Sequence, residues 1–184
     1  MINSSVMKKN LFLALLFLMA LNTSAQKYVL EKSSVIFYSE AAIENITAKN
    51  TKTTSVLNTE TSDLAFSVPI REFQFAKKLM QEHFNEKYMD SEKYPKSTFA
   101  GKLIGFDSSV KGAQQVKANG KLTIHGVTTN LEIPGTAEVL SNKIVLKAKF
   151  MVKLADYNIK IPQLMWQNIA EQVEVTVDFT YKPQ

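Results

Sequence analysis

The sequence contains no cysteine and only two histidines. A structural zinc site needs several sulfur, nitrogen or carboxylate ligands that converge, and two histidines far apart in the chain do not supply them. We therefore predict no metal site. The missing cysteines leave the compartment of the protein open, because an exported chain of this size needs no disulfide framework.

Sequence motifs of catalysis are absent as well. The chain has no nucleophile elbow, no phosphate-binding loop and no histidine spaced with a carboxylate as a catalytic pair. We predict no catalytic residues and no enzyme activity. Because serine and aspartate are common, an enzyme acting on small apolar substrates remains one alternative. The formal net charge is +5, or 22 − 2 − 17 = +3 without Lys8 and Lys9 of the N-terminal segment, which is too small to indicate a nucleic-acid partner.

Long apolar runs are missing except at the N-terminus. Leu11 to Leu21 is an unbroken run of eleven apolar residues, preceded by Lys8 and Lys9 and followed by the small residues Thr23-Ser24-Ala25. This order is typical of a secretory signal peptide, whereas a membrane span needs about 20 apolar residues. We predict a signal peptide over residues 1–25, a mature domain over residues 26–184 without a stable membrane span, and a periplasmic or secreted location.

The dominant pattern in the mature chain is strict alternation of apolar and polar residues, which predicts half-buried β-strands. In the clearest case, Ile144, Leu146, Ala148, Phe150, Val152 and Leu154 alternate with residues of which three are lysines. The same alternation predicts strands over residues 64–70, 116–124, 131–139 and 173–181. Weaker signals predict strands over residues 35–38, 53–58 and 97–104, and residues 42–48 are either a strand or a loop.

Two segments interrupt the β pattern. Apolar residues at helical spacing predict one short amphipathic helix over residues 75–84, and residues 156–171 predict an irregular connection with a helical turn. About eight one-sided strands indicate an antiparallel sheet closed into a barrel or packed as a sandwich. The predicted fold class is all-β, with one domain.

A barrel of eight strands has an interior that side chains fill or that holds one small ligand. The predicted inward face carries large phenylalanines beside Gly101, Gly120 and Ala148. Small residues next to large ones can leave a groove or can serve interdigitation in a dry core, and the sequence does not decide between the two.

Three sequence stretches resemble the YceI-like family. Residues 120–128 (Gly-Lys-Leu-Thr-Ile-His-Gly-Val-Thr), the segment from Met89-Asp90 to Phe99, and Phe150 to Asp156-Tyr157 match its most recurrent parts. The chain departs from many members in lacking a histidine near Val35 to Tyr38 and in carrying residues 77–84 where they have Arg-Asp-x-His-Leu. The resemblance implies an extended lipocalin-like barrel, export to the periplasm, binding of polyisoprenoid-type lipids and no catalytic machinery.

The leading hypothesis is an exported protein that carries or sequesters a long apolar molecule in the barrel lumen. Its partner is an apolar lipid, and no cofactor is expected beyond a bound isoprenoid lipid or quinone. The alternative is a filled barrel acting as an interaction or stress-response module. The sequence leaves the oligomeric state open, a homodimer included. The predicted ligand-binding residues are Phe66, Val68, Leu79, Phe84, Phe99, Leu122, Ile124, Phe150, Val152, Tyr157, Trp166 and Phe179.

Polar residues near these positions have simpler interpretations. His125 precedes Gly126 at the end of a strand, which favours a role in a hairpin turn. His83 is interpreted as a packed or rim residue that could also contact a ligand head group. Lysines 143, 147, 149 and 153 could attract an anionic membrane, but pairing with acidic residues on neighbouring strands is favoured. Trp166 and its apolar neighbours either pack at a barrel end or line a portal.

Overall fold

The computed structural model describes residues 27–40, 44–161 and 170–184. The predicted signal peptide lies outside these residues, and so do Leu164, Met165 and Trp166. The predictions made for them therefore stay predictions.

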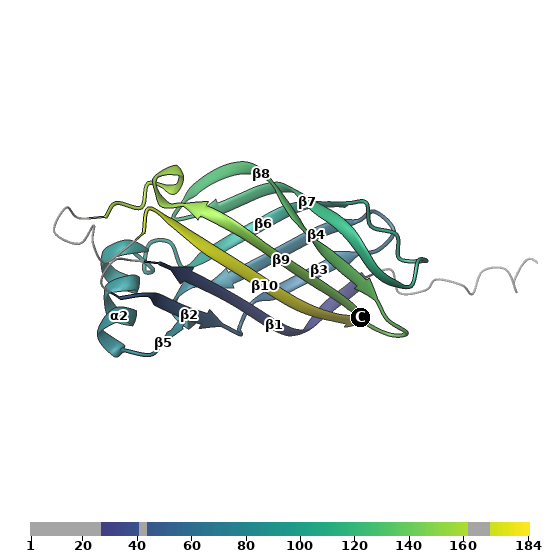
Figure 1. Cartoon of the computed structure of the whole chain (residues 1–184), viewed down its shortest axis with the longest axis horizontal. Coiled ribbons are helices and arrows are strands. Elements are labelled where there is room, and N and C mark those ends of the chain that lie inside the picture. The colour runs from purple at the N-terminus through teal and green to yellow at the C-terminus, as the bar shows by residue number, and fades with distance from the viewer. Residues whose placement is uncertain (1–26, 41–43, 162–169) are drawn as a thin grey trace, which may run out of the picture.

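The described residues form a closed antiparallel barrel (Figure 1). Its last strand, β10, pairs with its first, β1, over most of their lengths, so the ring has no open edge at this seam. The eight strands of the ring are β1 (Lys27–Ser39), β3 (Thr54–Asn58), β4 (Asp63–Pro69), β6 (Lys96–Ile104), β7 (Gly112–Ile124), β8 (Val127–Val139), β9 (Ile144–Lys153) and β10 (Gln172–Pro183). The prediction of an all-β, lipocalin-like antiparallel barrel is confirmed.

Two short strands extend the wall beyond the ring. Strand β2 (Ile46–Asn50) pairs with the second half of β1, while β3 pairs with the first half. Strands β2 and β3 therefore succeed each other along the same edge of β1. Strand β5 (Gln74–Phe75) follows β4 after the 3-10 turn η2 (Ile70–Glu72) and pairs with β2. Residues 46–48 of the segment left open between strand and loop are therefore strand.

The α-helix found in the described residues is shorter than predicted. Helix α2 spans Lys78–His83 and continues into a π-helical turn, η3 (Phe84–Tyr88). Phe75 was predicted to begin the helix, but its backbone pairs with Ala48 in the sheet, and its ring packs on Phe37 and Phe84. Sheet pairing and aromatic packing thus outweigh the helical spacing at this end. Helix α2 lies at one end of the barrel and the C-terminus at the other (Figure 1).

A buried asparagine links the end of β2 to the end of β4. Asn50, which ends β2, is fully buried. Its Nδ2 donates to the carbonyl of Pro69 at the end of β4 at 2.8 Å, and its Oδ1 accepts from the backbone N–H of Lys52 at 2.8 Å. One amide side chain therefore satisfies a backbone carbonyl at the end of β4 and a backbone N–H between β2 and β3.

Replacing Asn50 with alanine is expected to destabilise the barrel by about 1–3 kcal/mol, because the Pro69 carbonyl and the Lys52 N–H lose their partner where water has little access. The midpoint of urea unfolding measures this loss. Asn119→Ala, at an exposed position of β7, is the matched control. Equal midpoints for the two variants would show that the hydrogen bonds of the Asn50 amide contribute nothing to stability.

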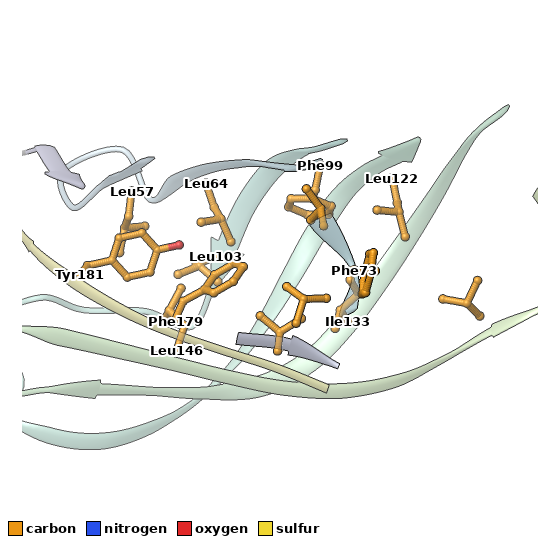
Figure 2. Packing of buried hydrophobic residues seen from close by; sticks show 14 of the residues in the cluster. Leu57, Leu64, Phe73, Phe99, Leu103, Leu122, Ile133, Leu146, Phe179 and Tyr181 are labelled. Atoms are coloured by element: carbon orange, nitrogen blue, oxygen red, sulfur yellow. The ribbon is translucent and has the colours of Figure 1, made fainter. Parts of the chain in front are cut away.

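Buried side chains such as Leu57, Leu103 and Tyr181 fill the barrel interior away from α2, and Figure 2 shows them with other members of the buried cluster. Phe99 is 1% exposed and stacks on Phe66 with 5.1 Å between ring centroids, and Phe179 meets Phe66 edge-on. Burial raises the pKa of Tyr181, whose hydroxyl lies 2.6 Å from Ser55 Oγ; that oxygen donates in turn to the Ala65 carbonyl. The buried phenol therefore has a hydrogen-bond partner in an otherwise apolar core.

The small residues of the inner face belong to this packing. Gly101 and Gly120 lie directly opposite each other on β6 and β7. A Cβ added at Gly120 would meet the Ala100 carbonyl and, at 2.9 Å, the ring of Phe99. These glycines let the two strands and an aromatic ring approach closely. At Gly101 and Gly120, the small residues therefore serve close packing in a dry core rather than a groove.

On the outer face, β9 lies between β8 and β10, and its lysines pair mainly with β10. Lys149 Nζ lies 2.8 Å from Glu174, and Lys147 Nζ lies 3.5 Å from Asp178. The lysines of β9 were also expected to pair with acidic residues of β8. This expectation is wrong for Glu132, whose carboxylate lies 2.7 Å from Lys117 Nζ of β7. The β8–β9 pairing covers only Gly135–Val139 of β8, so Glu132 lies beyond it.

Lys147→Glu is expected to lower stability more than Lys147→Ala, because it places a carboxylate opposite Asp178. The difference should be small and should shrink at high salt, since the site is exposed. Unfolding midpoints in low and high salt measure it. A glutamate variant as stable as the alanine variant at low salt would contradict the proposed charge pairing.

Candidate ligand-binding cavity

The part of the barrel near α2 contains a partly open cavity of about 530 Å³. This volume lies within the range of about 300–1,000 Å³ that is usual for small-molecule sites. The same strands that interlock in the filled half therefore enclose space in the other. On β9, for example, Leu146 packs in the filled core, while Phe150 and Val152 line the cavity.

The wall of the cavity is predominantly apolar. Strand alternation brings side chains from several strands to one surface, and α2 and η3 contribute from the end of the barrel. The apolar lining residues are Val35, Phe37, Ile46, Phe66, Val68, Ile70, Phe73, Phe75, Leu79, Met80, Phe84, Tyr88, Met89, Leu122, Ile124, Phe150, Val152, Leu154, Ile159, Val173, Val175 and Val177. Such a lining favours a ligand that is itself apolar over most of its surface.

Four phenylalanines form one side of the cavity. Phe37 of β1 stacks on Phe84 with 5.4 Å between ring centroids, and Phe84 contacts Phe75 at 5.0 Å and Phe73 at 5.5 Å. The rings come from a strand, the turn after η2, strand β5 and the π-helical turn. Because Met89 N–H donates to the Phe84 carbonyl, five residues back, the wider π turn fixes the backbone that carries the Phe84 ring.

Few polar residues line the cavity. They are Ser39, Ser97 and His83, together with one ion pair between Lys77 and Glu44, and the amphipathic Tyr88 also lines the cavity. Ser39 Oγ accepts from the N–H of Ala170 at 3.0 Å. Ser39 ends β1, Ser97 lies near the start of β6, and His83 ends α2, so these groups gather towards the α2 end of the cavity.

Eight of the predicted ligand-binding residues line the cavity. They are Phe66, Val68, Leu79, Phe84, Leu122, Ile124, Phe150 and Val152. Three others do not. Phe99 and Phe179 belong to the filled core, and Tyr157 is held in the turn η4 (Leu154–Tyr157), where its hydroxyl lies 2.6 Å from Thr129 Oγ1. Alternation predicted the inward direction of the two phenylalanines correctly but not their depth. Trp166 lies outside the described residues.

Several lining residues were not predicted. Val173, Val175 and Val177 share the inward face of β10 with Phe179, and the alternation in their sequence could have identified them. Phe73 and Met89 lie in turns, and no periodic signal marks them. Their place in the wall depends on how the chain returns to the barrel after β4 and after η3.

A hairpin turn supports the rim beside η4. His125 and Gly126 both have positive φ, 51° and 75°, which is the geometry of a two-residue turn between β7 and β8. His125 Nδ1 lies 3.2 Å from the Tyr157 carbonyl, and Tyr94 packs edge-on against the imidazole at 4.5 Å. The interpretation of His125 as a turn residue is confirmed, and the turn also anchors η4.

A closed antiparallel barrel with an apolar internal cavity defines the protein as lipocalin-like in fold. The model of the YceI-like domain matches residues 27–181, and the chain therefore belongs to the YceI-like family. No curated protein matches the sequence. Among the described residues, no helix has the length and apolar character needed to cross a membrane, and no group of three or more metal-ligating side chains is found.

Solved structures show the same fold at low sequence identity. A polyisoprenoid-binding domain from Saccharophagus degradans, implicated in plant cell wall breakdown, has a TM-score of 0.74 at 14% identity, over 88% of this chain and all of that one. BcnA from Burkholderia cenocepacia has a TM-score of 0.66 at 17% identity, over 80% and 95% of the two chains. The YceI protein of Campylobacter jejuni has a TM-score of 0.56 at 15% identity, over 90% and 89%.

Proposed function

We propose that the protein binds one long apolar molecule of the polyisoprenoid type in its cavity and carries or sequesters it. The observation that carries this proposal is the cavity of about 530 Å³ with its apolar lining. A barrel that served only as a rigid interaction module would gain stability by filling this space, because voids lose packing contacts. The filled half shows that this sequence can pack a barrel interior densely.

Burial of the ligand supplies the affinity. Each Å² of apolar surface removed from water stabilises a complex by about 25 cal/mol, less the cost of ordering the partners. The phenylalanine cluster and the valines of β10 would provide this contact along an unbranched or isoprenoid tail. The role assigned to the wall residues is therefore binding, and no residue is assigned to catalysis.

The family and one neighbour support the class of ligand. The neighbour from Saccharophagus degradans is described as a polyisoprenoid-binding domain, and its whole length is covered by the structural match. We further propose that the protein is exported by residues 1–25 and acts in the periplasm or outside the cell. A water-filled compartment is where an apolar molecule would need a carrier between membranes.

Native mass spectrometry of the full-length protein, expressed in its own cells and purified without detergent, tests the proposal. We expect a bound species whose mass, after extraction, identifies an isoprenoid lipid or quinone. Protein that is free of ligand as purified, and that also fails to bind an added polyprenol, would contradict lipid carriage. Intact mass in the same experiment tests cleavage after Ala25.

A further inference from the structure

We propose that the cavity selects amphiphiles with a polar but uncharged head group, such as an alcohol, an amide or a quinone carbonyl, over the same tail carrying a phosphate or carboxylate. This inference rests on the proposed function, because it names the chemical class of ligand for the same cavity. It follows from the charges and the hydrogen-bonding groups that the cavity presents.

The only ionised lysine, arginine or carboxylate side chains among the described lining residues are Lys77 and Glu44, and they neutralise each other. Lys77 Nζ donates to both carboxylate oxygens of Glu44, at 2.6 and 2.8 Å. Both oxygens of the carboxylate and the single cation are thus engaged in one contact. The pair is about half exposed, so solvent screens it, but Lys77, the one lysine or arginine in the described lining, is already paired.

An anionic head group would meet an unfavourable arrangement here. Phosphate sites in proteins use several donors, with arginine preferred for bidentate contact, and no arginine lines the described part of the cavity. A phosphate that approaches Lys77 would also meet the Glu44 carboxylate, which would repel it. The internal segments 41–43 and 162–169, which are not described, contain no ionisable side chain and so add no cation.

The hydrogen-bonding residues outside the ion pair suit a neutral head group. Ser97 and Tyr88 each present a hydroxyl that can donate and accept, and His83 presents an imidazole. None of these three side chains makes a hydrogen bond to another described residue, so each remains available to a ligand. Partial burial raises the pKa of the Tyr88 hydroxyl, which keeps it a neutral donor. These groups lie towards the α2 end, where the head of a tail-first ligand would rest.

The test compares two probes that share one tail, geranylgeraniol and geranylgeranyl diphosphate, added to delipidated full-length protein below their micellar concentrations. Displacement of an environment-sensitive fluorophore measures both affinities. We expect the alcohol to bind at least about tenfold more tightly. Equal affinities, or tighter binding of the diphosphate, would overturn the inference while supporting lipid binding. Binding of neither probe would instead overturn the proposed function.

A charge variant tests whether the ion pair sets this preference. Glu44→Gln releases Lys77 and removes the repelling carboxylate, so the ratio of diphosphate to alcohol affinity should rise about tenfold. Glu60→Gln makes the same change of net charge in the exposed turn between β3 and β4, at the filled end of the barrel, and should leave the ratio unchanged. The same ratio in both variants would show that Glu44 does not govern selectivity.

Discussion

Replacing Val152 with phenylalanine is expected to lower ligand occupancy by at least about tenfold while the barrel stays folded. Val152 lines the cavity from the inward face of β9, opposite Val173 of β10. The added ring would occupy space that the ligand tail needs. Because the cavity can absorb this volume, the unfolding free energy should change by less than about 1 kcal/mol. Lipid extraction with mass spectrometry and urea unfolding measure the two quantities.

The same substitution in the filled half is the matched control. Val116 is 6% exposed on β7 and belongs to the buried core, away from the cavity. Val116→Phe should cost about 1–3 kcal/mol through overpacking, and the protein that remains folded should retain its ligand. If Val152→Phe were as destabilising as Val116→Phe and left occupancy unchanged, the interior near α2 would be packed, and the main support for ligand binding would be lost.

The largest effect on stability is expected for Phe99→Ala, which should cost about 3–5 kcal/mol. Phe99 is 1% exposed, stacks on Phe66 and lies over the close approach of Gly120. The backbones of β6 and β7 are already in contact there, so they have little freedom to collapse into the space that the ring would leave. Urea or thermal unfolding of the ligand-free protein measures the cost.

Phe150→Ala separates packing from binding. Phe150 is half-buried and lines the cavity, so its removal enlarges an existing space rather than creating a new one. We expect a smaller loss of stability than for Phe99→Ala, together with weaker binding of geranylgeraniol. Equal losses of stability in the two variants would contradict the division of the barrel into a filled and a hollow half.

The sequence by itself determined which way the strand residues point. The inward positions of β9 are all apolar and three of its five outward positions are lysines, and a strand has a period of two, so the sequence identifies the inward residues of β9. The same argument holds for β7, β8 and β10. The sequence also predicted the hairpin turn at His125, because the glycine that follows it at the end of a strand can adopt a positive φ.

Only the tertiary structure decided how deep each inward residue lies. Phe99 and Phe150 both lie at inward positions of an alternating strand, yet Phe99 packs in the buried core and Phe150 lines the cavity. Alternation carries no information on the position of a residue along the barrel axis relative to the other strands. That position depends on the register of every pairing around the ring, which is a property of the whole sheet.

The end of the barrel near α2 shows the same limit. Phe75 was expected in a helix because its spacing to Leu79 is helical, but pairing with Ala48 placed it in the wall. The ion pair of Lys77 and Glu44 joins residues 33 positions apart, and the Asn50 amide joins β2 to the end of β4. Local propensity is a sum over neighbours in the chain, whereas these contacts form only when distant segments meet. The sequence therefore determined the sheet and its two faces, and the closure of the barrel decided where the cavity lies and which charges face it.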